Sequence, residues 1–391
     1  MATHTPMPLS ISTKPQYGAA HAPGLDLTPP VTPTIEDRNP SESSGNTLLS
    51  PVISGSDPPQ FVDELEYQLD VRGRPILFGS GAWSVVYKAF ASPRASKPIR
   101  PFTPPSSPPC SPTPVSRLVA VKSPGRRDAR AVLHAEALAL ARASSIPDSE
   151  HYIVPFHGYI ADSSSIIMSA IPLSLSTYIE DKARIAQQNF STRTMFDPAV
   201  GGSQWHDLAK KLIASLSWLH SSAQIVHGDI KPQNILLQPR TSLDDGIDST
   251  EFPYEPLLAD FSSSYSITAS DKPTGTSLSA VTPPYTAPEL LRSLSSPDVI
   301  PAPTSDVFSL AVTLLAAATG DLLIYSGFNA GQRLMCAKNG HHVIEFARSG
   351  GNGTRIPKNG IVEKIVKPAI AKEPAERITP GAWLKMAQTV A

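Results

Sequence analysis

The spacing of apolar residues changes along the chain, and the change predicts strands first and helices later. Short apolar runs predict strands at residues 85–89, 118–122, 153–160 and 165–171. Residues 129–143 and 208–221 have helical composition or spacing, and residues 310–319 predict a helix that is apolar on most sides and therefore buried. The chain turns mostly helical after Pro172. This order predicts an α+β fold of two lobes.

Two segments lack any such pattern. Residues 1–64 and 92–116 are rich in Pro, Ser and Thr and contain few large apolar side chains. They cannot bury enough apolar surface to offset the entropy of ordering, so we expect a disordered tail at 1–64 and a disordered insert at 92–116. The remaining chain divides into an N-terminal lobe at 65–171, which contains the insert, and a C-terminal lobe at 172–391.

The composition limits which binding partners and which cellular compartment we expect for this protein. The net charge of −1 gives no reason to expect a nucleic acid or an anionic membrane as partner. Two cysteines in 391 residues make no disulfide framework, which favours a reducing compartment. We see no signal peptide, and the apolar run at 310–318 is too short to span a bilayer. We expect a soluble cytoplasmic protein, with the nucleus as an open alternative.

Ser-Pro and Thr-Pro pairs recur in the two disordered segments. Thr28-Pro29, Thr103-Pro104 and Ser107-Pro108 are examples. They are compatible with proline-directed kinases or with SH3 or WW modules as partners. A plain flexible linker explains the same composition and stays open as the alternative.

The most informative polar segment is His227-Gly228-Asp229-Ile230-Lys231-Pro232-Gln233-Asn234, which lies between two apolar runs. Asp229 can accept a hydroxyl proton, Lys231 can neutralise phosphate, and Asn234 can hold a metal ion. Phosphoryl transfer requires these three functions at one point.

Three further motifs support the same chemistry, although each has a simpler explanation. Gly79 and Gly81 let the backbone approach phosphate closely, but they also suit an ordinary hairpin turn. Lys122 ends an apolar strand and needs a partner such as Glu136, unless it extends to water. Asp260 follows the apolar run 257–259 and could hold Mg²⁺ or only cap a turn.

The order of these motifs, followed by Ala287-Pro288-Glu289, resembles the eukaryotic protein kinase family over roughly residues 77–386. The resemblance implies the bilobal protein kinase fold, with a small antiparallel-sheet N-lobe and a helical C-lobe. It also implies ATP and Mg²⁺ as cofactors and a protein substrate.

The resemblance assigns roles to individual residues. Asp229, Lys231 and Lys122 would be catalytic, and Asn234 and Asp260 would bind Mg²⁺. The nucleotide would be held by Gly79, Gly81, Val86, Ala120, Lys122, Glu136, Ser169 and Ile171. Met168 would stand at the gatekeeper position before the hinge. Asp306 would brace the catalytic loop, and Arg377 would pair with Glu289.

Lys231 and Thr282 resemble the serine/threonine branch of the family, which predicts transfer of the γ-phosphoryl group of ATP to Ser or Thr hydroxyls. Ser84 and Ser262 stand where the family usually has glycine. We expect the lid to tolerate Ser84, and we expect Ser262 to make the segment after Asp260 harder to flip.

Gly228 replaces the arginine that, in the family, pairs with a phosphate on the activation segment. We therefore expect activity that is not controlled by an Arg–phosphate clamp at this residue. His-Gly-Asp also resembles small-molecule kinases of the aminoglycoside phosphotransferase type, and a pseudokinase scaffold is the remaining alternative. The presence of Lys122, Asp229 and Asp260 favours an active enzyme over the scaffold.

Overall fold

The computed structural model describes residues 57–94, 116–240, 251–268, 281–293 and 300–390. Residues 1–56 and 95–115, with their Ser-Pro and Thr-Pro pairs, therefore lie outside the described residues. Residues 57–64 of the expected tail lie inside them. There the Phe61 amide donates to the Tyr159 carbonyl at 2.9 Å, and the first strand begins at Glu64.

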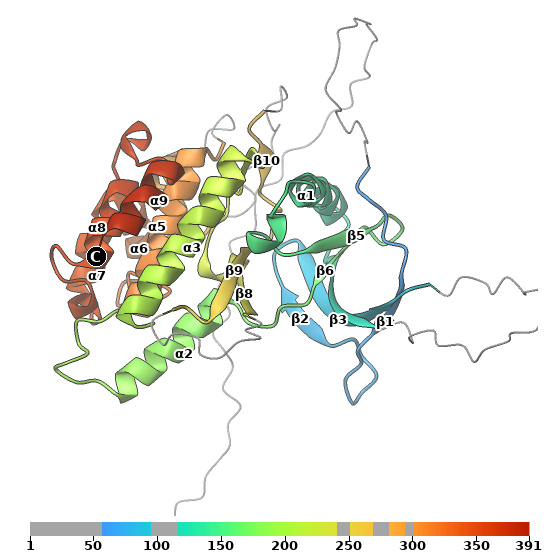
Figure 1. Ribbon diagram of the computed structural model, residues 1–391, viewed down its shortest axis with the longest axis horizontal. Coiled ribbons are helices and arrows are strands. Elements are labelled where there is room, and N and C mark those ends of the chain that lie inside the picture. The colour runs from blue at the N-terminus through green and yellow to red at the C-terminus, as the bar shows by residue number, and fades with distance from the viewer. Residues whose placement is uncertain (1–56, 95–115, 241–250, 269–280, 294–299, 391) are drawn as a thin grey trace, which may run out of the picture. The chain divides into compact units, whose positions relative to one another are not determined.

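An antiparallel sheet forms the first part of the described chain. Its strand order is β1-β3-β4-β6-β5, and β2 pairs with β3 outside this path. The strands are β1 (Glu64–Tyr67), β2 (Leu77–Ser80), β3 (Ser84–Ser92), β4 (Arg117–Pro124), β5 (Phe156–Ile160) and β6 (Ser165–Ser169). Helix α1 (Ala129–Ser144) packs against β4, β5 and β6, as Figure 1 shows.

The alternation of side chains along β4 determines which residues face α1. Val119 and Val121 belong to a small cluster on one face of the sheet, together with Ile167 of β6. Ala120 lies on the opposite face and belongs to the large core that includes α1. Because successive side chains of a strand point to opposite faces, Lys122 lies on the same face as Ala120. The strand thus directs Lys122 toward α1.

The second part of the described chain is mainly helical. Its helices are α2 (Leu175–Gln188), α3 (Gly202–Ser221), α4 (Pro288–Arg292), α5 (Pro303–Thr319), α6 (Ala330–Lys338), α7 (Val343–Ser349), α8 (Ile361–Val366) and α9 (Pro380–Thr389). Short strands pair β7 (Ile225–Val226) with β10 (Tyr265–Ser266), and β8 (Ile235–Pro239) with β9 (Tyr254–Leu258). The α+β division expected from the sequence is confirmed.

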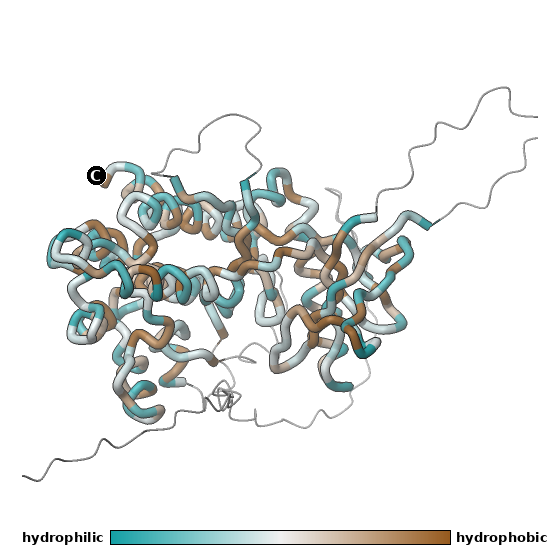
Figure 2. The backbone as a smooth tube through the Cα atoms, turned by 90° about the horizontal axis from the view of Figure 1, so that it is seen from below, coloured by the Kyte–Doolittle hydropathy of each residue, from teal (hydrophilic) through white to brown (hydrophobic). Residues whose placement is uncertain are grey.

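Helix α5 is the centre of this helical part. Every residue from 305 to 319 is buried, which confirms the prediction of a helix that is apolar on most sides. In Figure 2 the hydrophobic stretches run mainly through inner segments, and hydrophilic residues gather mainly at outer turns. Among the described residues, no helix has both the length and the apolar run that a bilayer crossing needs.

Two predicted boundaries were wrong. Residues 153–160 were expected to form one strand, but β5 begins at Phe156, and Ile153 forms only an isolated bridge with Leu258. Pro155 precedes β5 and has no amide hydrogen to continue a ladder. Residues 165–171 were also expected to form one strand, but β6 ends at Ser169.

Candidate active site

Lys122 forms a buried ion pair with α1. Its Nζ lies 2.6 Å from Glu136 Oε1 and 2.7 Å from Oε2, and the two residues are only 5% and 1% exposed. An unpaired ammonium at this depth would be costly, so the pair explains how the strand tolerates a lysine. The partner is the one that the sequence suggested.

Asp260 joins the same cluster from the segment after β9. Its Oδ1 lies 2.7 Å from Lys122 Nζ. Its φ of 62° is left-handed, which Asp adopts more readily than most residues do. The next residue, Phe261, donates its amide hydrogen to Glu136 Oε1 at 3.1 Å. Strand β4, helix α1 and the segment after β9 therefore meet at one lysine.

Two carboxylates face one ammonium in this cluster. Burial alone would lower the pKa of Lys122, but the charges of Asp260 and Glu136 raise it above its ordinary value. Burial opposes the charge on Asp260 as well, yet the Lys122 ammonium lowers the pKa of that carboxyl. The lysine and Asp260 are therefore charged at neutral pH, and a second cation beside Asp260 would be electrostatically favourable.

The residues expected at a Mg²⁺ site suit a hard cation. The Asp260 side chain is 39% exposed, so this carboxylate is accessible. Asn234 donates from Nδ2 to the Asp229 carbonyl and to Asp229 Oδ2, and its amide oxygen has no hydrogen-bond partner among the described residues. Within the described ranges no three His, Cys, Asp or Glu side chains form a ligand group. Such a site would thus need phosphate and water oxygens as well, as Mg²⁺ sites often do.

Asp229, Lys231 and Asn234 lie together, as their spacing suggested. Lys231 Nζ lies 2.7 Å from Asp229 Oδ2 and 3.1 Å from Thr282 Oγ1. Asn234 Nδ2 lies 3.1 Å from the same carboxylate oxygen. Burial raises the pKa of Asp229 above its usual value, although the Lys231 ammonium opposes this shift. A raised pKa makes a carboxylate a better proton acceptor.

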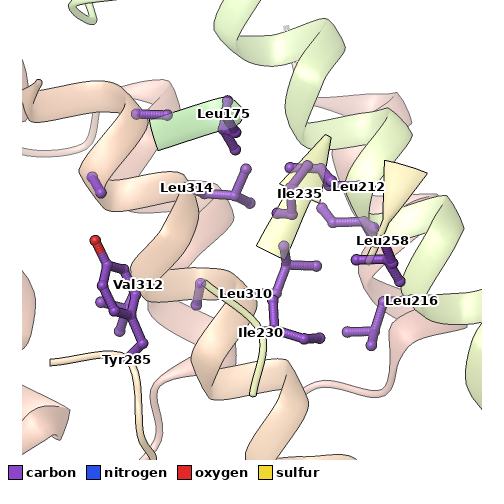
Figure 3. Close-up of a cluster of buried hydrophobic side chains, with 14 of the residues drawn as sticks. Leu175, Leu212, Leu216, Ile230, Ile235, Leu258, Tyr285, Leu310, Val312 and Leu314 are labelled. Carbon is purple, nitrogen blue, oxygen red and sulfur yellow. The ribbon is translucent and has the colours of Figure 1, made fainter. Parts of the chain in front are cut away.

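Ile230 anchors this loop to the core between the two charged residues. It is 1% exposed. Figure 3 shows its side chain in the buried cluster with Leu216 of α3, Ile235 of β8 and Leu310 of α5. A buried apolar side chain between Asp229 and Lys231 restricts how far the two polar groups can move apart.

Asp306 of α5 holds the start of the loop by its backbone. Its Oδ2 accepts from the His227 amide at 2.8 Å, and its Oδ1 accepts from the Gly228 amide at 2.9 Å. His220 Nε2 lies 2.9 Å from the same Oδ2. Asp306 is 1% exposed, so these bonds are made away from water. Sequence reasoning suggested Asp306 but missed His220, whose place in α3 carries no local signal.

Gly228 has a backbone conformation that favours glycine. Its φ is 79°, and a Cβ added there would lie 2.6 Å from the Ser263 carbonyl oxygen. The residue is therefore constrained both by its own dihedral angle and by the segment that follows Asp260. By contrast, Ser262 is absent from the described residues with positive φ, so serine fits its backbone without strain.

The residues expected to contact a nucleotide flank the Lys122 cluster on the sheet. Gly79 is the register partner of Val86, and the Gly81 amide donates to the Ser84 carbonyl at 2.8 Å, which closes the hairpin. Ala120 pairs with Met168, the expected gatekeeper.

Ser169 and Ile171, the residues expected to form the hinge, come just after Met168 in the chain. Ser169 ends β6, and its amide already donates to the Pro155 carbonyl at 2.9 Å. Ile171 is 7% exposed and lies in the connection to α2.

Two cavities of about 420 Å³ and 540 Å³ lie beside α2, and neither is at the candidate active site. Arg355 lines both of them, but none of Lys122, Asp229 or Asp260 does.

A family model described as the protein kinase domain matches residues 115–388. The chain belongs to the protein kinase family. The match begins just before β4, so Gly79, Gly81 and Val86 precede it. Val86 lies in β3, which pairs with β4 at the start of the matched part.

Curated relatives that the chain resembles are named as serine/threonine-protein kinases. The chain is 35% identical over 186 residues to the serine/threonine-protein kinase PknK of two Mycobacterium tuberculosis strains. It is 34% identical to PknK of Mycobacterium bovis. Each alignment covers 45% of this chain but only 14% of the relative.

The chain also contains the ion pair between Arg377 and Glu289 that its motifs predicted. Arg377 binds Glu289 with two hydrogen bonds of 2.7 Å, from Nη1 to Oε1 and from Nη2 to Oε2. The Arg377 side chain is 0% exposed and also donates to the carbonyls of Thr304 and Ala371. This pair joins α4 to the segment before α9 and is remote from Lys122 in the chain.

Proposed function

We propose that this protein is an active serine/threonine protein kinase that uses ATP and Mg²⁺. The observation that carries the proposal is the position of Lys122 between Glu136 and Asp260, at 2.6 Å and 2.7 Å. A scaffold without turnover has no need for a buried cluster with two carboxylates on one lysine, since such clusters are costly to bury.

The nucleotide would be bound by the sheet. Gly79 and Gly81 would cover its phosphates, because glycine lets the backbone approach them closely. Val86 and Ala120 would contact the adenine ring, and its edge would meet the backbone of Ser169 and Ile171. Lys122, oriented by Glu136, would bind the α- and β-phosphates.

The acceptor hydroxyl would be oriented by Asp229, which would accept its proton. The raised pKa of Asp229 suits that task. Lys231, 2.7 Å from Asp229, would stabilise the charge of the transferring phosphoryl group. Mg²⁺ held by Asn234 and Asp260 would neutralise phosphate charge.

A Ser or Thr acceptor is supported by the contact of Lys231 with Thr282. Lys231 Nζ donates both to the Thr282 hydroxyl at 3.1 Å and to Asp229, the proposed proton acceptor, at 2.7 Å. Residues 281–293 thus begin next to the catalytic loop, where a protein substrate would present its hydroxyl group. Phosphoamino acid analysis of labelled products would test this part, and phosphotyrosine alone would contradict it.

The proposal as a whole is tested with purified full-length protein, labelled ATP·Mg²⁺ and a generic protein acceptor. We expect label on the acceptor or on the chain itself. Asp229→Asn should abolish transfer while nucleotide binding is largely retained. Asp162→Asn, at an exposed site, is the matched control and should transfer normally.

Each other outcome identifies a different protein. Nucleotide binding without transfer to any acceptor would indicate a pseudokinase scaffold. Turnover of ATP that labels small hydroxyl compounds but no protein would indicate a small-molecule phosphotransferase. Equal transfer by wild type and Asp229→Asn would refute the role of Asp229.

A further inference from the structure

The smaller of the two cavities, of about 420 Å³, lies where α2 ends and α3 begins. It is lined mainly by Lys182 of α2, by residues 197–204 and by Arg355. None of the residues that we assigned to the candidate active site lines it. Its volume is within the range of about 300–1,000 Å³ that is usual for pockets that bind small molecules. The cavity is therefore a candidate ligand site of its own.

Arg355 is a recessed cation with unused hydrogen-bond donors. The residue is only 8% exposed, and its Nη1 donates to the Asp197 carbonyl at 2.8 Å. Its Nε and Nη2 have no partner among the described residues, and neither nitrogen is sealed off from solvent. Neither Arg355 nor Lys182 belongs to an ion pair in the described ranges. A buried arginine is rarely left without an acidic partner, so these donors suit an anionic ligand.

Helix α3 begins at the same cavity with free backbone amides. Its N-cap residue, Gly201, has no side chain to cap the helix, and the first amide that finds a helical acceptor is that of Trp205. The amides of residues 202–204 therefore have no acceptor within the described part of the chain. A Cβ added at Gly201 or Gly202 would meet nothing within 4 Å, so a ligand can approach this backbone closely. The start of a helix with free amides is a favourable place for an anion.

The charges around the cavity also favour an anion. Burial lowers the pKa of the Arg355 guanidinium, and the charge of Asp197 opposes that shift. An anion in the cavity would stabilise this desolvated cation. Asp197 is the one carboxylate among the residues that line the cavity, whereas Arg355 and Lys182 both carry positive charge. The two cations and the start of α3 together outweigh the single carboxylate.

We propose that this cavity binds the phosphate group of a small molecule, whose oxygen atoms accept hydrogen bonds from the Arg355 guanidinium and from the first amides of α3. A phosphate offers several strong acceptor oxygens at one point, and a planar guanidinium binds it with two parallel bonds. The remaining volume, beside the apolar residues Ile185 and Val200, accommodates the rest of the molecule. The recessed position of Arg355 favours a small ligand over a phosphorylated segment of another protein.

The test is a calorimetric titration of the full-length protein with inorganic phosphate and with glucose 6-phosphate. We expect both to bind and ATP not to displace them. Gly202→Pro removes one amide donor that has no partner in the protein, and proline is well tolerated at the first position of a helix. This variant should keep the fold and weaken phosphate binding by about tenfold, the effect of losing one hydrogen bond to a charged group. Arg355→Gln should weaken binding at least as much.

Arg184→Gln is the matched control, because Arg184 lines only the larger cavity and its loss should leave the Kd for phosphate unchanged. Arg355 also holds the Asp197 carbonyl, so Gly202→Pro is the decisive variant. No measurable binding of phosphate, or an unchanged Kd in Gly202→Pro, would overturn the proposal. Loss of binding in Arg184→Gln would move the anion to the larger cavity and would overturn it as well.

Two further outcomes concern the identity of the ligand and of the site. Displacement of phosphate by ATP would place the anion at the candidate active site and refute the proposal. A phosphothreonine peptide that binds at least tenfold more tightly than both small probes, and loses this affinity in Gly202→Pro, would assign the site to a protein partner instead. None of these variants changes a residue that we assigned to phosphoryl transfer, so the result is independent of the proposed kinase activity.

Discussion

Replacing Gly228 with alanine should destabilise the protein, and replacing it with the arginine usual in the family should do so at least as strongly. The φ of 79° places the residue in the left-handed region, and an added Cβ would lie 2.6 Å from the Ser263 carbonyl oxygen. Backbone on both sides must shift to relieve this contact, because the obstructing atom is not the end of a flexible side chain. The Gly228 amide is held at the same time by Asp306 at 2.9 Å.

Two unfavourable contributions and one favourable contribution determine how much Gly228→Ala lowers the free energy of unfolding. A left-handed conformation costs a non-glycine residue about 1–2 kcal/mol. Forcing extra volume into a packed site costs about 1–3 kcal/mol. Reduced freedom of the unfolded chain returns about 0.4–1 kcal/mol. The expected loss for Gly228→Ala is therefore about 1–5 kcal/mol in the free energy of unfolding.

Two other glycines separate these contributions in urea unfolding experiments. Gly327 has a φ of 92° and nothing within 4 Å of an added Cβ, so Gly327→Ala should show the dihedral cost alone. Gly351 has neither feature, and Gly351→Ala should be close to neutral. The reasoning is refuted if Gly228→Ala costs no more than Gly327→Ala, or if Gly228→Arg leaves stability unchanged.

Three further perturbations test other parts of the structure. Arg377→Met should cost about 3 kcal/mol in urea unfolding, the lower end for breaking a buried pair, because Glu289 loses its partner while its side chain is 26% exposed. Adding Glu289→Gln should recover part of the loss, and an unchanged midpoint would contradict this. Lys122→Met should leave two facing carboxylates and lower the melting temperature without nucleotide, and Glu136→Gln in the same chain should partly restore it. Burial and the Arg117 charge lower the pKa of His157 to about 4, so the folded state binds fewer protons than the unfolded state between that pH and about 6.5. The free energy of unfolding should therefore fall by about 1–2 kcal/mol as the pH drops through this window, after allowance for partial exposure, and His157→Gln should flatten the dependence.

The sequence predicted the elements that have a clear apolar period. Residues 129–143 and 208–221 lie in α1 and α3, and the buried character of α5 followed from its composition. Strand β1 (Glu64–Tyr67) was not predicted, since its charged and mostly exposed residues show no apolar alternation. It exists because β3 supplies a ladder partner, which is a tertiary effect that local propensity does not contain.

The identity and order of the motif residues in the sequence predicted the candidate site. The sequence predicted the contacts among these residues only in part. The spacing of Asp229, Lys231 and Asn234 suggested convergence, and the structure brings them within hydrogen-bonding distance. The link from Lys122 to Asp260 spans 138 residues, and no local signal specifies it. The contact of Arg142 with Thr268 was missed for the same reason, because an exposed arginine at a helix end has many ordinary explanations.

The glycine that stands before Asp229, where the family usually has arginine, fits the local backbone closely. Asp306 fixes the Gly228 amide, and the Ser263 carbonyl occupies the space where a Cβ would begin. A charged side chain at this position would thus have to distort the segment that carries Asp260 before it could reach any phosphate. Arg142 contacts that same segment from α1, at Ser266 and Thr268, where no such strain arises. A phosphate contact through a side chain at residue 228 is therefore physically opposed by the backbone that surrounds Gly228.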